Sequence, residues 1–573
     1  LPWPAACPFQ SGVSPMSPQA QLKHTPSQSP LLGQMLVSAK LISEHHLRYA
    51  LDTQKASREK LGKILVRSGL LTEKNLSRVL ARQIEIPFLN IDQLDPDPGL
   101  VRKFSTKRCL TLKMCPIKED KNKILTATSE IPSPRQEQEV LRVTGKRPSF
   151  SLAAEGALTF AIHKAFSHVD VPIETALERE TSFLISDVQE SCSPEAFLQN
   201  LLHFAIIKRA TDIHIRPLPL SIDIAFRIDG TLAHMLSLPP QLQRIVSSLK
   251  LKASMDISEQ RLPQDGRFSV SILSQEFDIR VSSIVSAYGE DLVLRILPKA
   301  RADFTLHSLG FLEEDIDVIQ SLFELPSGIA LVTGPTGSGK STTMIAGLMS
   351  LDLLMKNIVT VEDPIEYLVP LARQTQVNPD IGYDFRHAMY HFLRHDPDVI
   401  LIGELRDDKT ASAAMTAALT GHLVLSTLHS DSVIGSITRL QSLNVDNLII
   451  AEALNVVLSQ RLIRCVCPHC KELYPPTPKE IDYIGQNVAA LSRGRGCTKC
   501  NHTGYFGRTL IYGILELEQE LVMMLKENAP IRSIEKKARE KRKRSMFGVG
   551  VDKIMKHVTT VEELQRTLGK AEN

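Results

Sequence analysis

The chain has 573 residues, enough for three or four domains, and its 43% apolar and 23% charged residues are typical of a soluble protein. The formal net charge of +3 is too weak a basic bias to indicate nucleic-acid binding. Every apolar run is far shorter than the ~20 residues that a membrane-spanning helix needs.

Residues 1–30 are rich in Pro, Ser and Gln and lack the apolar core of a signal peptide, which predicts a disordered leader. A tandem repeat follows, in which Leu32–Val37 recurs 29 residues later as Leu61–Val66. Each copy continues through a cap, Ser43 or Thr72, into a second amphipathic helix. We expect two helical hairpins that stack and share a buried face.

The middle of the chain changes pattern twice. A predicted helix, Pro194–Arg209, precedes several strand-like runs such as Ile222–Ile228, which indicates an α+β domain. After Pro298, apolar strands alternate with helices, the pattern of a parallel sheet. The last sixty or so residues are predicted to be helical and are highly charged.

A glycine-rich loop follows the buried-strand run Ile329–Val332 and precedes a helix. It matches the phosphate-binding pattern G-x-x-x-x-G-K-S, in which backbone N–H groups and a helix N-terminus surround phosphate oxygens. Lys340 would reach the β- and γ-phosphates, and Ser341 would bind Mg²⁺. The predicted ATP- and Mg²⁺-binding residues are Gly334, Pro335, Thr336, Gly337, Ser338, Gly339, Lys340, Ser341 and Thr342.

Three further polar residues, Glu362, Glu404 and His429, each follow an apolar strand-like run closely. Taken singly, Glu362 and His429 fit a structural role as well as a functional one. The carboxyl ends of parallel strands are where ligands bind in open α/β sheets, and a carboxylate there can hold the water shell of Mg²⁺. Together with the glycine-rich loop, these residues predict one hydrolytic site.

Four of the nine cysteines form two Cys-x-x-Cys pairs separated by 26 residues. Two such pairs can converge on a tetrahedral Zn²⁺, and four thiolates leave no open position, so the metal would be structural. The alternative is a set of reduced, unpaired thiols, and Cys465 and His469 are rival ligands. The predicted ligands are Cys467, Cys470, Cys497 and Cys500.

Four boxes in this order, LVTGPTGSGKST, TVEDPIEY, LRHDPDVILIGELRD and TGHLVLSTLH, resemble the GspE/PilB family of ATPases for type II secretion and type IV pilus assembly. Supporting motifs extend the resemblance from about residue 31 to residue 570. It implies a multi-domain α/β protein: a RecA-like P-loop ATPase domain, a PAS-like α+β middle domain, an N-terminal MshEN-like domain and a small zinc module. The QTQVNP run favours type II secretion over pilus assembly.

The predicted domains are a leader (1–30), an MshEN-like domain with the repeat (31–167), a linker (168–189), the middle domain (190–300), the ATPase domain (301–464), the zinc module (465–510) and a C-terminal helical module (511–573).

The resemblance also implies roles for the candidate catalytic residues. Glu362 would orient or activate the attacking water, Glu404 would lie near Mg²⁺, and His429 would sense the γ-phosphate, while Lys340 would carry phosphate charge. Lys409 stands where the family usually has Glu, which removes no catalytic group.

In the family, arginines of the middle domain contact phosphate, partly across a subunit boundary. The motifs carry this role to Arg227, Arg267 and Arg280. The alternative is that these arginines pair with acids of their own domain. Ala225 stands where the family often has another Arg, which leaves that contact in question.

The partners implied are a homo-hexamer and an inner-membrane platform protein, with the chain cytoplasmic and peripheral at the inner membrane. The basic run Glu535–Arg544 is either a solvated helix face or a contact for acidic phospholipids. No nucleic-acid partner is expected. Three alternatives stay open: a nucleic-acid translocase or DNA-uptake motor, disfavoured by the weak net charge; a pilus-retraction ATPase, disfavoured by the zinc module; and a non-hydrolysing scaffold, disfavoured by the complete set of acids.

The tandem repeat resembles the MshEN domain, which in some of these ATPases binds cyclic di-GMP through two copies of a motif beginning Arg-Leu-Gly. Other motif positions are retained here, namely Gly33, Gly62, Gln54 and Gln83. Leu31 and Lys60 hold the two arginine positions, and neither forms the bidentate bond of a guanidinium with phosphate. We therefore expect a docking module for the membrane partner.

Overall fold

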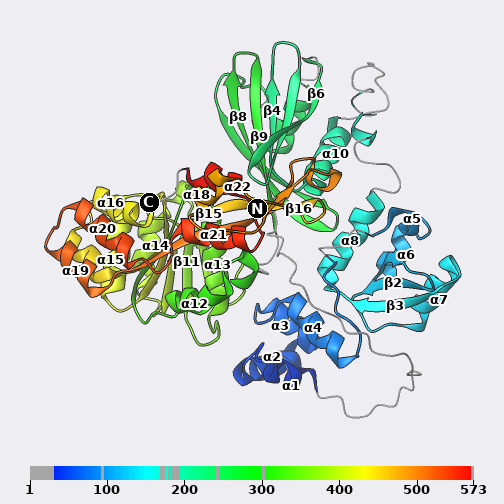
Figure 1. Ribbon diagram of the computed structural model, residues 1–573, viewed down its shortest axis with the longest axis horizontal. Helices are drawn as coiled ribbons and strands as arrows, with labels where there is room; N and C mark the ends of the chain where they lie inside the picture. Colours follow the sequence, from blue (N-terminus) through cyan, green and yellow to red (C-terminus); the bar gives the residue numbers. More distant parts are fainter. Residues whose placement is uncertain are drawn as a thin grey trace. The chain divides into compact units, whose positions relative to one another are not determined.

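The computed structural model describes residues 31–91, 96–167, 175–178, 181, 194–240, 244–299 and 304–569 (Figure 1). The described chain forms two compact units, one ending before residue 301 and one beginning there. The expected leader and most of the expected linker lie outside the described residues. Within the described ranges, none of the helices combines the length and the apolar character that crossing a bilayer requires.

The tandem repeat forms four helices, as its pattern predicts. They are α1 (Leu32–Ser38), α2 (Glu44–Ser57), α3 (Leu61–Arg67) and α4 (Glu73–Gln83). Both predicted caps are confirmed, because the side chain of Ser43 accepts from His46 N and that of Thr72 accepts from Asn75 N. Seven buried apolar residues from both copies make one small core.

Close helix packing explains the glycines of the repeat. A Cβ on Gly33 would lie 2.6 Å from Leu47 Cδ1, and one on Gly62 would lie 2.9 Å from Leu76 Cδ1. Each glycine therefore lets the first helix of its copy approach a leucine of the second helix. Because Leu47 and Leu76 also correspond in the repeat, the motif is a packing unit in this structure.

A three-stranded sheet with helices follows the repeat. Its elements are α5 (Pro98–Val101), α6 (Thr106–Thr111), β1 (Met114–Glu119), β2 (Lys123–Thr128), α7 (Pro134–Thr144), β3 (Arg147–Leu152) and α8 (Glu155–Ser167). The strand order is β1-β2-β3, antiparallel and then parallel. Helices α5, α6 and α8 contribute to its core.

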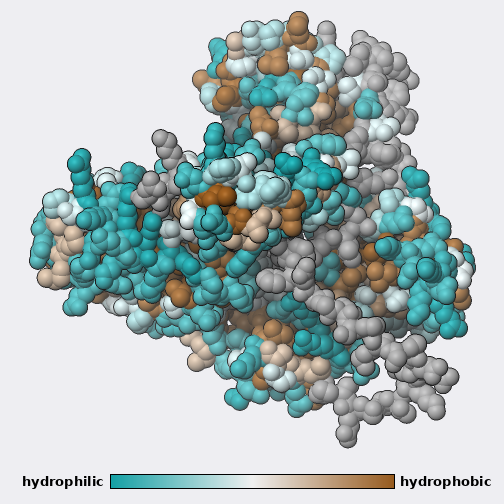
Figure 2. All heavy atoms as spheres, viewed as in Figure 1, coloured by the Kyte–Doolittle hydropathy of each residue, from teal (hydrophilic) through white to brown (hydrophobic). Residues whose placement is uncertain are grey.

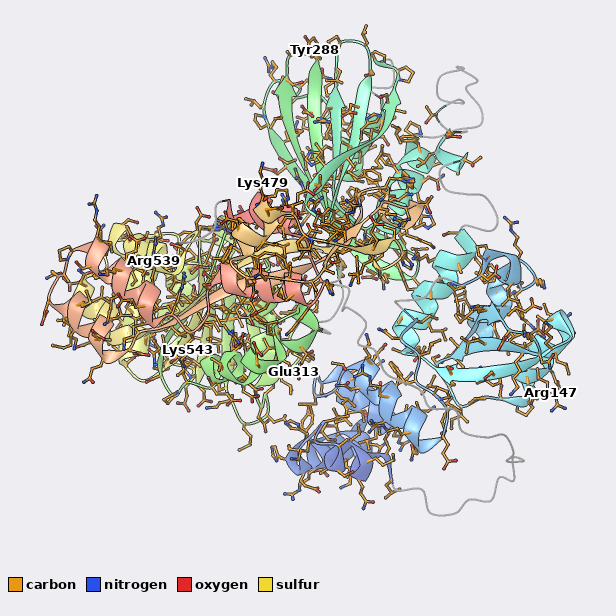
Figure 3. All side chains as sticks on the ribbon, in the orientation of Figure 1. Arg147, Tyr288, Glu313, Lys479, Arg539 and Lys543 are labelled. Atoms are coloured by element: carbon orange, nitrogen blue, oxygen red, sulfur yellow. The ribbon has the colours of Figure 1, made fainter. Side chains whose placement is uncertain are left out.

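The middle domain is an antiparallel sheet of order β6-β5-β4-β9-β8-β7. Its elements are α10 (Pro194–Ile207), β4 (Ala210–Pro217), β5 (Ile222–Ile228), β6 (Thr231–Leu238), α11 (Arg244–Lys252), β7 (Gln264–Ile272), β8 (Gln275–Ser286) and β9 (Gly289–Pro298). One sheet face is apolar and packs against α10 and α11. The other face carries polar side chains. Tyr288, between β8 and β9, is exposed (Figure 3).

The second unit is built on a seven-stranded sheet of order β12-β11-β13-β14-β10-β15-β18, with helices on both faces. Six strands are parallel and β18 is antiparallel. In chain order its elements begin α12 (Ile316–Phe323), β10 (Gly328–Thr333), α13 (Lys340–Ser350), β11 (Ile358–Glu362), β12 (Arg373–Gln376), α14 (Phe385–Phe392), β13 (Val399–Ile402), α15 (Asp408–Leu419), β14 (Leu423–Leu428), α16 (Val433–Ser442), α17 (Asn447–Ala453) and β15 (Leu454–Val466).

The segment predicted as a zinc module is inserted between β15 and β18 (Tyr505–Glu516). It contains β16 (Lys471–Tyr474), α18 (Pro478–Ile484) and β17 (Leu491–Gly494). The C-terminal helices are α19 (Gln519–Lys526), α20 (Ile531–Lys541), α21 (Met546–Met555) and α22 (Val561–Leu568). The first two pack on one sheet face and the last two on the other, so these segments form one unit with the seven-stranded sheet.

We expect cyclic di-GMP to bind weakly or not at all. Leu31 and Lys60 are exposed, and Gln54 Nε2 already donates to Glu59 O at 2.8 Å. Each missing charge-assisted bond, worth ~1.5–3 kcal/mol, weakens binding by about 10- to 100-fold. Isothermal titration of the full chain measures it. The double variant Leu31→Arg/Lys60→Arg is the control and should bind more tightly. A sub-micromolar dissociation constant for the unaltered chain would contradict the prediction.

Candidate functional site

The glycine-rich loop joins the end of β10 to the start of α13. Gly334, Gly337 and Gly339 have φ angles of +150°, +78° and +88°, a region that other residues rarely adopt. A Cβ on Gly334 would also collide with the main-chain oxygen of Gln460. The loop therefore needs glycine at its first position for space as well as for conformation.

Lys340 is the first residue of α13 and is 9% exposed. Its Nζ donates to Gly334 O at 2.8 Å and to Pro335 O at 3.1 Å. Burial disfavours the charged ammonium and lowers the pKa of Lys340 to about 8, against the opposing charge of Glu366. A cation at a helix N-terminus favours anion binding, because the positive end of the helix dipole and the first free N–H groups face the same ligand. Ser341, the next residue, is exposed.

Parallel register places the other predicted catalytic residues at the same edge of the sheet. Val361 pairs with Ile402, Ile402 pairs with Ser426, and Leu428 pairs with Thr333. The chain therefore leaves β11, β13, β14 and β10 at nearly the same level. Glu362, Glu404, His429 and the glycine-rich loop come together at these four strand ends, as the sequence predicts.

Glu362 is a buried carboxylate held by two side chains. Its Oε1 accepts from Thr360 Oγ1 at 2.8 Å and from Gln374 Nε2 at 2.9 Å, and only 7% of the residue is exposed. Burial raises the pKa of Glu362, although these two hydrogen bonds oppose the shift. A carboxylate with a raised pKa is a stronger base than an ordinary surface glutamate.

Glu404 lies between the side chains of Arg406 and His429. Arg406 forms ion pairs with Glu404 and, at 2.9 Å, with Asp363, so it links the strand ends of β13 and β11. His429 Nε2 lies 3.1 Å from Glu404 Oε2. Burial, followed by the positive charges of Lys340 and Arg406, lowers the pKa of His429 and favours its neutral form.

Three further side chains contribute to this region without having been predicted from the sequence: Arg406, Gln374 and Gln460. Arg406 lies inside the box LRHDPDVILIGELRD, two residues after Glu404. Its positive charge beside this acidic strand end was therefore a sequence signal from which its role could have been predicted. Gln374 lies on β12, and Gln460 lies on β15 with its Nε2 2.8 Å from Ser338 O. Only the strand order brings these two glutamines to the site.

The predicted arginines lie in the first unit, on the polar face of the middle sheet. Arg227 is opposite Asp212, Asp212 is opposite Arg295, Arg295 is opposite Arg280, and Arg280 is opposite Arg267. These residues form one row across five strands, called here the arginine row. Arg295, which the sequence analysis missed, belongs to it.

The arginine row is only partly neutralised within its own domain. Asp212 lies 3.0 Å from Arg295 Nε and 3.8 Å from Arg227 Nε. Arg267 and Arg280 face each other directly, and like charges in opposite positions destabilise a sheet. The row therefore favours an anionic ligand. Ala225 is buried and opposite His214, outside the row.

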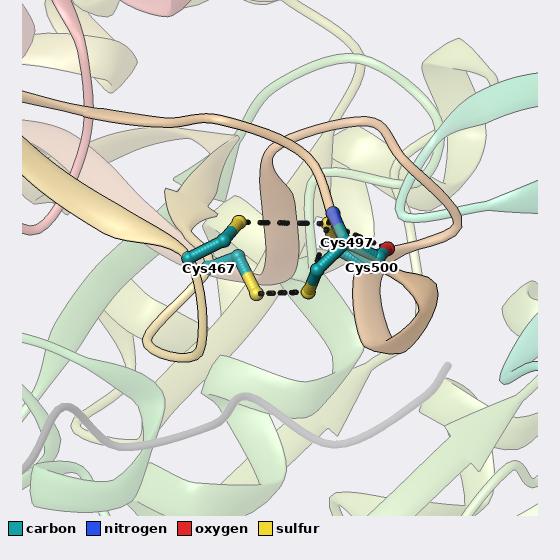
Figure 4. Close-up of side chains that lie close together, drawn as sticks. Cys467, Cys497 and Cys500 are labelled. Atoms are coloured by element: carbon teal, nitrogen blue, oxygen red, sulfur yellow. Dashed lines mark hydrogen bonds between the residues drawn. The ribbon is translucent and has the colours of Figure 1, made fainter.

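The four predicted metal ligands converge. Their sulfurs all lie within 4.8 Å of one another, and the closest pairs are 3.7 and 3.9 Å apart (Figure 4). Four sulfurs at the ~2.3 Å Zn–S distance form a tetrahedron with edges of about 3.8 Å. The rival ligands Cys465 and His469 are not in this cluster.

Backbone N–H groups also point at the thiols. Gly496 N lies 3.3 Å from Cys470 Sγ, and Cys497 N and Gly504 N lie 3.2 and 3.3 Å from Cys500 Sγ. Burial alone would raise the pKa of the Cys500 thiol, but the N–H groups of Cys497 and Gly504 and the neighbouring thiols lower it to about 7. The donor set fits Zn²⁺.

The basic run near the C-terminus is largely paired within its own unit. Lys537, Lys541, Lys543 and Arg544 form ion pairs with Glu520, Glu518, Glu516 and Asp315, respectively. The main chain of Lys543 and Arg544 exchanges hydrogen bonds with Ile514 of β18. The visible surface around α19 and α20 is mostly hydrophilic (Figure 2). This pairing favours an intramolecular role for the run over contact with acidic phospholipids.

Two protein-family models match the chain, and several known proteins are similar to it over most of its length. The model described as "Type II/IV secretion system protein" matches residues 188–566, and the "MshEN domain" model matches residues 84–171, the part that follows the helical repeat. The type IV pilus assembly ATPase PilB of Myxococcus xanthus is 33% identical over 555 residues, 93% of this chain and 98% of that protein.

Relatives from type II secretion match equally well. The type II secretion system ATPase E of Vibrio cholerae is 42% identical over 370 residues, 64% of this chain and 73% of that protein. Protein E of the type II system of Xanthomonas campestris is 34% identical over 522 residues, 88% of this chain and 92% of that protein. Among solved structures, the ATPase DotB of Legionella pneumophila matches with a TM-score of 0.49 and 21% identity, covering 66% of this chain and 97% of that one.

We predict one Zn²⁺ per chain, bound by the four clustered cysteines. Metal analysis of the purified protein should find it. Cys470→Ser should release the metal and destabilise the second unit, because the cluster holds together the segment that connects β15 to β18 of its sheet. Cys465→Ser is the matched control and should retain the metal. A Cys467→Ser/Cys500→Ser double variant that keeps its full zinc content would refute the assignment.

Proposed function

The chain belongs to the family of type II/IV secretion system proteins, and we propose that it is an ATP-hydrolysing motor that drives assembly of pilin-like subunits and protein secretion across the cell envelope. The observation that carries the proposal is the meeting of the glycine-rich loop with Glu362, Glu404 and His429 at one edge of a parallel sheet. Each of these groups is suited to a different task in phosphoryl transfer. All of them lie within the four sequence boxes that resemble the family.

The roles follow from the contacts at the strand ends. Lys340 and the loop N–H groups bind the phosphates, and Lys340 exchanges its two loop carbonyls for phosphate oxygens. Ser341 and Glu404 are suited to hold Mg²⁺, which supplies neutralisation of phosphate charge when bound. Glu362, with its raised pKa, accepts a proton from the attacking water.

His429 senses whether the γ-phosphate is present and passes this change to the residues at the strand ends. It contacts Glu404, and Arg406 connects Glu404 with Asp363 beside Glu362. Loss of the γ-phosphate changes the charge that this set of residues faces. A rearrangement of His429 and Arg406 would then transmit hydrolysis to the rest of the molecule.

The arginine row supplies the remaining phosphate contacts, in our proposal from a neighbouring subunit of a homo-hexamer. Guanidinium groups neutralise developing γ-phosphate charge, which contributes about 10³–10⁵ in rate in other nucleotidases. The facing pair Arg267 and Arg280 supports this role, since an anion offsets their repulsion. Arg227, Arg295 and the pair thus form one anion-binding surface.

The motor works in the cytoplasm at the inner membrane, docked through its N-terminal domain on a platform protein. Relatives from both type II secretion and type IV pilus assembly align along most of the chain. The pilin-like cargo is therefore that of one of these two systems.

Substitutions at the strand ends should separate binding from chemistry. Lys340→Ala should abolish turnover, because it removes the cation that binds phosphate. Glu362→Gln and Glu404→Gln should each lower kcat by more than ~10²-fold while ATP still binds. Steady-state hydrolysis and nucleotide titration measure the two effects, with Lys409→Ala as an exposed control on the neighbouring helix α15. Near-normal turnover in both Gln variants would refute the catalytic assignment.

Activity should depend on assembly. If Arg227, Arg267 or Arg280 acts on a neighbour's nucleotide, the specific ATPase activity rises steeply with protein concentration. Mixing an arginine variant with Glu362→Gln should restore partial activity, because each supplies the group that the other lacks. Sedimentation of the same samples gives the oligomeric state, and a fully active monomer would rule the proposal out.

A further inference from the structure

Gln460 is a buried glutamine beneath the glycine-rich loop. It lies on β15, which pairs with β10 in parallel, so that Ser459 is opposite Thr333, the last residue before the loop. Gln460 is therefore level with the first residue of the loop. Its exposed fraction is 0%, and no catalytic role assigned above uses it.

Both ends of the loop rest on this one residue. Gln460 Nε2 donates to Ser338 O at 2.8 Å. A Cβ on Gly334 would lie only 2.4 Å from the main-chain oxygen of Gln460, and a Cβ on Gly339 would lie 3.4 Å from its Nε2. Gln460 therefore packs directly against the first and the last glycine of the loop.

Packing alone does not explain why this buried side chain is a polar amide. Gln460 Oε1 and the hydroxyl of Ser338 are buried and have no hydrogen-bond partner among the described residues. Buried polar groups are normally paired, and a methionine would fill the same space without leaving an acceptor unpaired. The glutamine is therefore explained by its donated bond to the loop and not by its contribution to the core.

We infer that Gln460 is a positioning residue that sets the orientation of the Ser338–Gly339 peptide for phosphate binding. The carbonyl of Ser338 and the N–H of Gly339 belong to one planar peptide and point in opposite directions. Holding the carbonyl against the sheet turns the N–H away from it, toward the side where phosphate binds. Gly339 has no Cβ to resist a flip of this peptide, so an external bond has to hold it.

The inference rests on the proposed ATP site, and its test measures nucleotide binding by the full chain. Gln460→Met keeps the volume and removes the donor, so the dissociation constants of ATP and ADP should each rise about tenfold, equivalent to ~1.4 kcal/mol. Lys340→Ala marks loss of the site itself.

A matched control lies on the same strand. Asn455 Nδ2 donates to Ser327 O at 3.2 Å, the same amide-to-carbonyl bond at the opposite end of β10. Asn455→Ala should lower the melting temperature and leave nucleotide affinity within twofold. Equal losses of affinity in Asn455→Ala and Gln460→Met would overturn the inference, since the effect would then be general destabilisation.

Gln460→Glu gives a second, independent readout. A protonated carboxyl group can donate to Ser338 O, whereas a carboxylate repels both that carbonyl and phosphate. The affinity deficit relative to the unaltered chain should therefore shrink as the pH falls from 8 to 6. A deficit that does not change with pH, or ATP binding by Gln460→Met within twofold of normal, would overturn the role of Gln460. Failure of the unaltered chain to bind ATP would instead overturn the proposed function.

Discussion

The parallel pairing of β10, β11, β13 and β14 is the constraint on which the nucleotide site depends. In an antiparallel sheet, alternate strands would end at opposite edges, and Glu404 would be separated from Glu362 by the length of a strand. Here the ladder hydrogen bonds that stabilise the core also bring four strand ends level. The proposed catalytic groups therefore need only short-range contacts, such as the ion pairs of Arg406, to be held in place.

The same sheet connects the nucleotide site with the cysteine cluster. β15 carries Gln460 under the loop and continues to Val466, next to Cys467. Seven residues of extended chain span about 23 Å. On the way, Arg461 contacts Asp431, two residues after His429, and Arg464 pairs with the fully buried Glu563 of α22. Ligation of a metal by the four thiols would brace the C-terminal end of a strand whose middle residue, Gln460, lies under the glycine-rich loop.

Local sequence patterns predicted the parts of the site that are continuous in the chain. The spacing of residues in the loop from Gly334 to Thr342 and in the two Cys-x-x-Cys pairs largely determines the local geometry. The strands before Glu362 and Glu404 can be recognised because they are continuous apolar runs. The contributions of Arg295, Gln374 and Gln460 could not be predicted in this way. Each of these residues contacts a neighbour on another strand, and no local sequence pattern specifies the order of the strands in a sheet. The sequence does not predict β6 as a strand either, since its edge position leaves Thr231–Leu238 without regular alternation of buried and exposed residues.

The basic segment at Lys543 and Arg544 also bears on the behaviour of the molecule in a crowded solution. β18 is the last strand of the seven-stranded sheet, and an outermost strand offers unsatisfied N–H and C=O groups to any other extended chain. Ile514, near the C-terminal end of β18, donates and accepts main-chain hydrogen bonds with this segment instead. The main chain of Lys543 and Arg544 thus covers the edge at Ile514, so that this residue offers no free template for intermolecular β-pairing and aggregation.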